Sequence, residues 1–263
     1  KCSNYTLTGN TKAFSIERAS MTAPSSPSDK NYTGKEQVSG ITCPTGSTAG
    51  GMQKATNAGT YTASCTPDGN HKWSDGTTTA KSITWTINPK SVAITWGTTT
   101  IFTYNGKAQG PSASISTGIS TESIILEITA ETNAGSYTST ASCGGVNTVL
   151  GISGKCSNYT LTGTTKAYTI NKQKVSPPTN LNVTTAGIVT WTGVSNATSY
   201  QISMDNTNWT AATSGIDYLS SIISSTGTRT IYLRGINSDT TNYETGASAN
   251  KSISVYTVTA KKW

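Results

Sequence analysis

Histidine, acidic residues and long apolar runs are scarce in this chain of 263 residues, and each scarcity excludes a class of function. Hydrolysis needs a base beside a nucleophile, but the one histidine, His71, lies in the polar segment PDGNHKW. The 12 acidic residues form no paired cluster of the kind that glycosidases or calcium sites use. No apolar run approaches the roughly 20 residues that span a bilayer. We therefore expect no enzyme, no cofactor, no metal site and no membrane insertion.

The basic charge of the chain does not indicate a nucleic-acid partner. The net charge is +7, but the lysines are scattered singly along the sequence rather than gathered in runs. Zinc is disfavoured as well, because the five cysteines include no C-x-x-C pair. We expect a solvated, weakly basic surface and no nucleic-acid binding.

The residues that are abundant favour β-structure. The chain has 51 threonines and 35 serines, and threonine suits a pleated, half-exposed surface. Apolar residues alternate, as in Ile83, Trp85 and Ile87, whereas no stretch of ten residues keeps a helical period. The 6 tryptophans and 12 tyrosines argue against disorder. The sequence predicts an all-β fold.

Repeated segments divide the chain. KCSNYTLTG occurs at residues 1–9 and again at 155–163, and two further landmarks recur in order: YTGKEQ at 32–37 with YNGKAQ at 104–109, and TNAGTY at 56–61 with TNAGSY at 132–137. The insertions fall between landmarks, as they do where loops diverge on a shared framework. We predict the terminal strands of a truncated preceding repeat at 1–19, complete repeats at 20–88 and 89–173, and a different domain at 174–263.

The cysteines follow the same division. Cys43 pairs with Cys65 inside the first complete repeat, and Cys143 with Cys156 inside the second, by this interpretation. Cys2 has the position of Cys156, so we expect it to be unpaired by truncation. Disulfides place the chain in an oxidising, extracellular setting.

The two N-A-G segments predict tight turns before a strand. Tyr61 and Tyr137 enter a strand just before an inward cysteine, as in the tyrosine corner of immunoglobulin-like sandwiches. Gly59 and Gly135 are expected to take a positive φ. The turn asparagines Asn57 and Asn133 are expected to cap their own backbone. An isopeptide bond from Lys35 to Asn57, or from Lys107 to Asn133, is a weaker alternative. Glu122, Glu127 and Glu131 are expected to face solvent.

These shared landmarks, with the closing pattern T-K-A-[FY]-[ST]-I, resemble bacterial immunoglobulin-like repeats of the MBG type over residues 1–173. Residues 174–263 carry IVTWTGV, YQISM and IYLRGIN in an order that resembles a fibronectin type III domain. The resemblance implies tandem β-sandwiches in an elongated array, of the kind found in stalks and adhesins of bacterial surface proteins. It carries no catalytic residue to transfer.

We therefore expect a structural stalk or fibre segment at the cell surface that spaces or presents a distal module. Its partners would be the neighbouring domains of the array. One alternative is an adhesin that binds glycan or a host protein through the fibronectin-like domain. Candidate glycan contacts are aromatic residues outside the clear alternations: Trp73, Trp209 and Tyr218. Trp209 has a second interpretation, as a cap on the fibronectin-like core. A further alternative is a filament in which copies of the chain associate by strand addition, because residues 10–17 form an isolated terminal strand.

Overall fold

The structure is a computed structural model that describes residues 2–6, 8–9, 11–148, 155–218 and 227–255. Within these ranges the regular elements are strands, apart from two single-turn 3-10 helices, η1 (Cys2–Asn4) and η2 (Cys156–Asn158). The all-β prediction is confirmed. The chain forms two compact units: unit 1 comprises residues 1–95, 114–127 and 141–164, and unit 2 comprises residues 96–113, 128–140 and 165–263. Residues 89–173 contribute to both units, and the domain limits given above stay a prediction.

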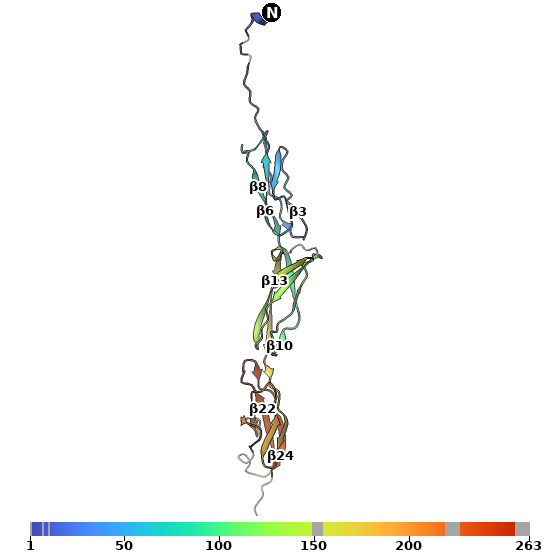
Figure 1. The fold of residues 1–263 in the computed structure, drawn as a ribbon, viewed down its shortest axis with the longest axis vertical. Helices are drawn as coiled ribbons and strands as arrows, with labels where there is room; N and C mark the ends of the chain where they lie inside the picture. The colour runs from blue at the N-terminus through green and yellow to red at the C-terminus, as the bar shows by residue number, and fades with distance from the viewer. Residues whose placement is uncertain (1, 7, 10, 149–154, 219–226, 256–263) are drawn as a thin grey trace, which may run out of the picture. The chain divides into compact units, whose positions relative to one another are not determined.

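The largest sheet of unit 1 is built on the strand that follows the first N-A-G turn. Its order is β2 (Lys30–Asn31), β8 (Lys81–Asn88), β6 (Gly59–Pro67) and β4 (Ser47–Gly51). β6 and β8 lie side by side (Figure 1). They are antiparallel, and their register places Tyr61 opposite Trp85. Ile83, Trp85 and Ile87 are all buried, so their predicted shared face is the inner one.

Three smaller sheets accompany it. Their strands, in sheet order, are β3 (Gln37–Val38) with β5 (Lys54–Ala55); β1 (Ala19–Met21) with β7 (His71–Trp73); and β11 (Ala113–Ile115) with β9 (Lys90–Trp96) and β14 (Tyr159–Thr162). The pairs β1–β7 and β9–β14 are both parallel. In each pair, the first strand of a predicted domain, which we call a body (residues 20–88, 89–173 or 174–263), pairs with a short strand from late in the same body, although β1 begins one residue earlier, at Ala19.

The apolar core of unit 1 runs without interruption from the first predicted repeat into the second. Its buried members are Tyr32, Ala63, Trp85, Ile87, Val92, Ile124 and Tyr159. A smaller cluster of Cys65, Trp73 and Ile83 lies beside Met21, Ile41 and Cys43. Because one continuous core joins residues from both sides of position 89, unit 1 is more than a single repeat.

Unit 2 contains the remaining strands. In sheet order they are β10 (Ile101–Thr103), β15 (Thr165–Asn171), β13 (Gly135–Thr148) and β12 (Glu122–Ile128), of which β12 and the end of β13 lie mostly in unit 1; β17 (Thr179–Val183), β18 (Ile188–Thr192) and β21 (Ile216–Asp217); β20 (Thr210–Ala212), β19 (Ser199–Ser203), β22 (Gly227–Ile236) and β24 (Ala249–Val255); and β16 (Gln173–Lys174) with β23 (Tyr243–Glu244). Val189, Ile202, Ile231 and Leu233 form a buried apolar cluster in this unit. β16 and β23 are again a parallel pair.

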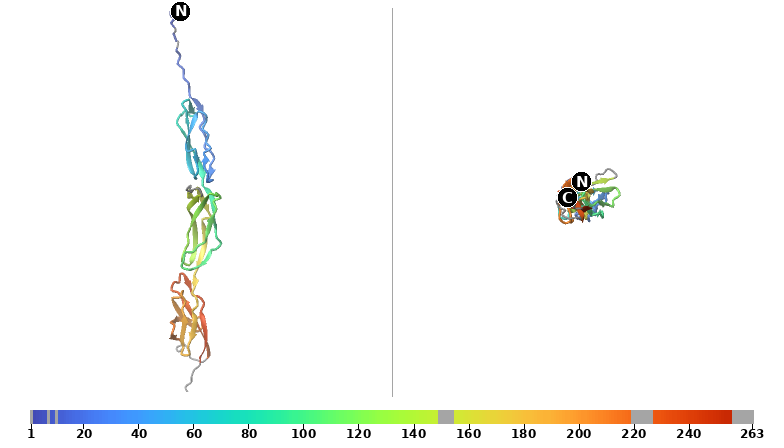
Figure 2. Two further views of the ribbon diagram at one scale, coloured as in Figure 1. Left: turned by 45° about the vertical axis from the view of Figure 1, so that its right-hand side comes forward. Right: turned by 90° about the horizontal axis from the view of Figure 1, so that it is seen from below.

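The segment before β1 makes few contacts. Residues 11–18 have no regular structure and are exposed throughout; they are the dark-blue stretch ahead of the first sheets in Figure 2. Near its end the segment is tied to the rest of unit 1 by an ion pair between Glu17 and Lys72 at 3.6 Å, and the Nε of Arg18 donates to the carbonyl of Gly69 at 3.1 Å. The N–H of Ala19 then donates to the carbonyl of Asn70 at 2.9 Å, and β1 begins.

Candidate functional site

A buried asparagine in unit 1 clamps the first N-A-G turn. The N–H of Ala58 donates to Oδ1 of Asn158 at 2.8 Å, and Nδ2 of Asn158 donates to Oδ1 of Asn57 at 3.0 Å. Asn158 is 0% exposed. A single side chain thus satisfies one backbone donor and one side-chain acceptor of a turn about 100 residues earlier in the chain. We call this arrangement joint 1.

The second N-A-G turn is clamped in the same way inside unit 2. The N–H of Ala134 donates to Oδ1 of Asn242 at 2.8 Å, and Nδ2 of Asn242 donates to Oδ1 of Asn133 at 3.2 Å. Asn242 is 6% exposed. This is joint 2. Each joint connects residues of one predicted domain to residues of the next, within one compact unit.

The tyrosine that follows each N-A-G turn stabilises the turn by a hydrogen bond. The hydroxyl of Tyr61 donates to the carbonyl of Asn57 at 2.6 Å, and that of Tyr137 to the carbonyl of Asn133 at 3.0 Å. These hydrogen bonds confirm the tyrosine corners that the sequence predicts. Each tyrosine hydroxyl binds the carbonyl of the turn asparagine and so fixes the conformation of the turn. The N–H of the turn alanine then points to the clamp asparagine, to which it donates.

The two turn glycines differ from expectation. Gly59 has a φ of +154°, but Gly135 is not among the residues with positive φ, so that half of the prediction is wrong. Glycine is required at position 135 for a steric reason instead, because a Cβ there would lie 2.8 Å from the hydroxyl oxygen of Tyr137 and clash with it. Glycine is therefore needed at position 59 for its positive φ and at position 135 for the space that Tyr137 occupies.

Each clamp asparagine is oriented by its own short turn. Asn158 ends η2, where its N–H donates to the carbonyl of Lys155 at 2.9 Å. Asn242 is oriented by Asp239, whose Oδ2 accepts from Nδ2 of Asn242 at 2.8 Å and whose Oδ1 accepts from its N–H at 3.2 Å. The hydrogen bonds from Asn242 hold the pKa of the Asp239 carboxyl below its usual range. Both asparagines then lead into the parallel pairs described above, β9–β14 and β16–β23.

An aromatic pair accompanies each clamp. The rings of Tyr32 and Tyr159 meet edge to face with centroids 5.5 Å apart, and those of Tyr104 and Tyr243 do so at 5.4 Å. Tyr32 and Tyr104 open the repeated Y-x-G-K segments, while Tyr159 and Tyr243 directly follow the clamp asparagines. The same two sequence features therefore meet in both joints.

Joint 1 also contains a carboxylate. The hydroxyls of Tyr32 and Tyr159 donate to Oε1 and Oε2 of Glu122, each at 2.5 Å. The expectation that Glu122 faces solvent is wrong, because both of its oxygens point at these phenols. Burial, and next the hydrogen bond to Glu122, raise the pKa of both tyrosines above the ordinary range. For Tyr32, a hydrogen bond to Asn158 acts weakly in the other direction.

These raised tyrosine pKa values predict a loss of stability in alkali. Both phenols bind their protons more tightly in the folded state, so their contribution is complete below pH 10 and is lost as the pH rises above it. We expect the free energy of unfolding of unit 1 to fall above pH 10 with a slope approaching about 2.7 kcal/mol per pH unit for two protons. Denaturant unfolding across this pH range would measure it. The double variant Tyr32→Phe/Tyr159→Phe should show a much flatter profile, and an equal slope in that variant would contradict the assignment.

Both predicted disulfides are present. The structure joins Cys43 to Cys65 and Cys143 to Cys156. Disulfides of this kind persist in oxidising environments, in line with the predicted extracellular setting. The side chain of Cys2 lies outside the described residues, so its unpaired state stays a prediction.

The three aromatic residues proposed as glycan contacts do not come together. Trp73 is 1% exposed and packs with Cys65 and Ile83, so the prediction that it contacts a glycan is wrong. Its Nε1 donates to the carbonyl of Thr79 at 2.8 Å, which satisfies the ring's one polar group. Tyr218 packs against the core of unit 2, and its hydroxyl accepts from the N–H of Thr213 at 2.6 Å.

Trp209 retains a partly open position. The guanidinium carbon of Arg234 lies 4.0 Å from the centroid of its indole ring, a cation–π contact. Both residues line an open hollow of about 380 Å³ with Asn206 and Ser248. Arg234 is itself fixed by two hydrogen bonds to Oε1 of Gln201, at 2.9 and 2.8 Å. One face of the indole is thus covered by the chain's own arginine.

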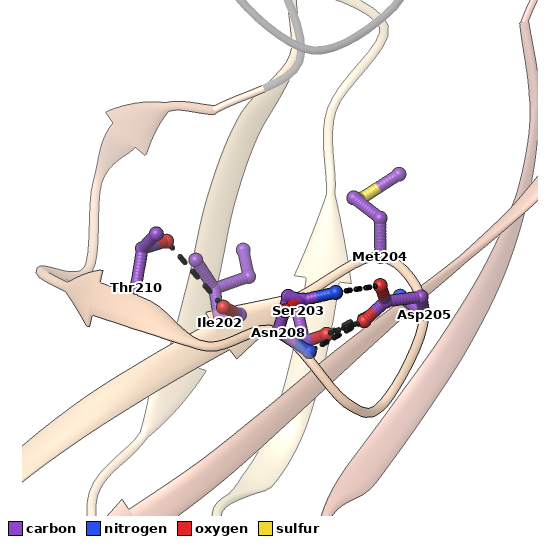
Figure 3. Close-up of a pocket in the computed structure, with 6 residues that line it drawn as sticks. All are labelled: Ile202, Ser203, Met204, Asp205, Asn208 and Thr210. Atoms are coloured by element: carbon purple, nitrogen blue, oxygen red, sulfur yellow. Dashed lines mark hydrogen bonds between the residues drawn. The ribbon is translucent and has the colours of Figure 1, made fainter.

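A neighbouring hollow is lined by Ile202, Met204, Asp205, Asn208 and others, and hydrogen bonds join several of these residues to each other (Figure 3). Oδ1 of Asp205 accepts from the hydroxyl of Ser203 and the N–H of Asn208, and its Oδ2 accepts from Nδ2 of Asn208. These bonds, the N–H of Asn208 first, hold the pKa of Asp205 well below its usual range. The carboxylate therefore stabilises the turn that follows β19.

Isopeptide chemistry finds no support at the turns. The side-chain oxygens of Asn57 and Asn133 accept from Asn158 and Asn242, and not from their own backbone as expected. Glu36, the one acid next to Lys35, pairs with Lys54 at 3.1 Å. The turn asparagines therefore serve the joints.

Sequence reasoning missed both clamp asparagines. One signal was present: the pair Asn-Tyr occurs at 158–159 and at 242–243, each time directly before the short strand that pairs with the start of its body. A scan against models of known protein families finds no match for this chain, and neither does a search of curated protein sequences. In the described part of the chain, no helix is both long and apolar enough to cross a membrane. Among those same residues, no three His, Cys, Asp or Glu side chains gather as a metal site.

Proposed function

We propose that this chain is a structural stalk segment of an extracellular bacterial surface protein, in which asparagine clamps fix each immunoglobulin-like body to the next. The observation that carries the proposal is the recurrence of one clamp at two successive joints, Asn158 on Asn57–Ala58 and Asn242 on Asn133–Ala134. The disulfides support the extracellular setting. The bacterial surface rests on the resemblance of the repeated motifs alone.

The physical argument concerns orientation. Domains joined only by a linker move relative to each other unless their interface is large and apolar. At joint 1 an apolar core is shared by both predicted repeats, and the clamp adds direction to that contact. The buried amide is satisfied only when the turn and the clamp meet in one geometry, and a buried polar group left unpaired costs about 1–3 kcal/mol. A spacer must keep its successive domains in a fixed orientation and needs no ligand. The two joints provide such a fixed orientation.

The test removes both clamps. In the variant Asn158→Ala/Asn242→Ala, we expect each body to keep its fold while its direction relative to the next is released. Backbone residual dipolar couplings measure this: strand amides on the two sides of a joint should fit one alignment tensor in the parent chain and need two in the variant. Asn182→Ala, at an exposed position of β17, is the matched control and should behave as the parent does. A variant that still fits one tensor across each joint would contradict the proposal.

The adhesin alternative depends on the hollow beside Trp209. An indole, a guanidinium and two polar side chains are suited to contact a sugar. A glycan array probed with the full chain separates the two functions, because a spacer should give no signal. Binding that Trp209→Ala abolishes would favour the adhesin.

A further inference from the structure

A third asparagine, Asn70, has the position of the two clamps. Asn158 and Asn242 each directly precede a short strand that runs parallel to the first strand of its body. In the register of these pairs, Tyr159 lies opposite Lys90, and Tyr243 opposite Gln173. Asn70 precedes β7 in the same way, and His71 lies opposite Ala19 at the start of β1. Asn70 therefore has the same structural position in the first body that Asn158 and Asn242 have in the second and third.

Asn70 differs from Asn158 and Asn242 because its side chain clamps no N-A-G turn among the described residues. It is exposed, and within the described residues its hydrogen bonds are those of its backbone: its N–H donates to Oδ1 of Asp68, and its carbonyl accepts from the N–H of Ala19, both at 2.9 Å. Its side-chain amide forms no hydrogen bond to a turn in the described part of the chain. His71, which stands where Tyr159 and Tyr243 stand, is held by Asp68 at 2.6 Å and is half-buried.

An independent observation lies directly before β1. Ile87 precedes Lys90 by three positions, Ile170 precedes Gln173 by three, and Ile16 precedes Ala19 by the same spacing. Ile87 is paired with Gly59 and Ile170 with Gly135, the glycines of the two clamped turns. Their strands, β8 and β15, lie inside their sheets, β8 between β2 and β6 and β15 between β10 and β13, and both carry buried aromatic and aliphatic side chains.

The matching segment, residues 11–17, has the same apolar alternation with nothing covering it. Phe14 is 84% and Ile16 is 88% exposed, whereas their counterparts Trp85, Ile87, Tyr168 and Ile170 are buried. Figures 1 and 2 draw this segment without a neighbouring strand in the described part of the chain. Two exposed apolar side chains on one face of an extended segment indicate a strand that lacks its sheet.

We propose that residues 11–17 and Asn70 together form a docking site for an immunoglobulin-like body that presents a free N-A-G turn and lacks its closing strand. The strand that begins at the turn's glycine pairs antiparallel with residues 11–17, with the glycine opposite Ile16. The turn's Ala N–H then donates to Oδ1 of Asn70, and Nδ2 of Asn70 donates to the turn asparagine. The tyrosine of the body's Y-x-G-K segment packs against His71. This inference extends the clamp of the proposed function to a third joint and rests on it.

A second copy of these 263 residues does not fit the site. Both of its N-A-G turns are already clamped, by Asn158 and Asn242. The strands that begin at those turns, β6 and β13, are already paired with β8 and β15. The occupant must bring a turn and a sheet edge that are both free.

The chain's own sequence supplies such a body for the experiment. Residues 155–163 and 1–9 are identical, and residues 164–170 match 10–16 at most positions. Placing a copy of residues 89–154 ahead of Lys1 of the full chain therefore rebuilds the second repeat with residues 1–17 as its end. In this extended chain the added Cys143 is expected to form a disulfide with Cys2, as Cys143 does with Cys156.

The main measurement compares one substitution in two chains. Asn70→Ala should leave hydrogen exchange and melting unchanged in the original chain, where the side chain is exposed. In the extended chain it should speed exchange of the added turn's Ala amide by about tenfold or more, because that N–H loses its acceptor. Asn31→Ala, at another exposed position of unit 1, is the control and should change neither chain.

Three outcomes would overturn the inference. If Asn70→Ala changes hydrogen exchange equally in both chains, Asn70 is not a clamp. The proposed function would still be supported by Asn158 and Asn242. Added residues that show no folded amide resonances and no disulfide to Cys2 would show that residues 11–17 are not a closing strand. Concentration-dependent dimerisation of the original chain, abolished by Asn70→Ala, would make a second copy the occupant.

Discussion

Reduction of the disulfides is expected to destabilise unit 1 strongly and to leave unit 2 unchanged. All five cysteines belong to unit 1, and its two bridges close loops with sequence separations of 22 and 13 residues. Loops of this size restrict the unfolded chain by about 3 kcal/mol each. Together the bridges should account for roughly 6 kcal/mol, a large share of the stability of a small domain.

The two bridges should not contribute in the same way. Cys65 is buried in the cluster with Trp73 and Ile83, so removing the Cys43–Cys65 bridge also disturbs packing. The Cys143–Cys156 bridge instead anchors the chain two residues before the clamp asparagine Asn158. We expect Cys43→Ala/Cys65→Ala to lower Tm more, and Cys143→Ala/Cys156→Ala to loosen joint 1 as well.

Calorimetry with and without reductant measures the effect. The transition of unit 1 should move down by roughly 10–20 °C, while that of unit 2 stays in place. A chain that carries all four substitutions is the control, since reductant should no longer shift its unit 1 transition. A unit 2 transition that moves with reductant, or a unit 1 transition that does not, would contradict the assignment of stability to these bridges.

The all-β fold and the disulfides were predictable because their signals are local or repeated. Alternation such as Ile83, Trp85 and Ile87 fixes a strand and its buried face within a few residues. The cysteine pairs were found because they keep the same order as the repeated landmarks. The tyrosine corners followed from a tyrosine placed just after an N-A-G turn.

The joints could not be predicted because their chemistry joins residues that are distant in sequence. Asn158 lies about 100 positions after the turn it clamps, and asparagine is common in this chain. Trp73 was misjudged because its surroundings in sequence are polar, although in the structure it ends a three-residue strand with an inward side chain. Glu122 was misjudged because a strand carboxylate normally faces water, and only the tertiary structure brings two phenols to it.

Glu122→Leu is expected to lower the stability of unit 1 by about 2–4 kcal/mol. The hydroxyls of Tyr32 and Tyr159 would both lose their acceptor, and an unpaired buried hydroxyl costs about 1–3 kcal/mol. Glu122 is held in place independently, since the hydroxyl of Thr117 donates to its carbonyl at 2.8 Å, so the loss concerns the side chain. Denaturant unfolding of parent and variant would give the difference.

Two further variants decide whether the effect arises from the hydrogen bonds. Glu122→Gln keeps one acceptor, and its amide can donate to a hydroxyl that rotates, so we expect a loss of only about 1 kcal/mol. The triple variant Glu122→Leu/Tyr32→Phe/Tyr159→Phe contains no unpaired polar group and should recover most of the stability lost in Glu122→Leu. If the triple variant is instead less stable than Glu122→Leu, the carboxylate acts through packing and not through the two phenols.

Tyr32 lies before position 89 and Glu122 after it. Recovery of stability in the triple variant would therefore also show that apolar packing, and not only hydrogen bonding, stabilises joint 1. The clamp of Asn158 on the N-A-G turn would then be the element that selects a single orientation.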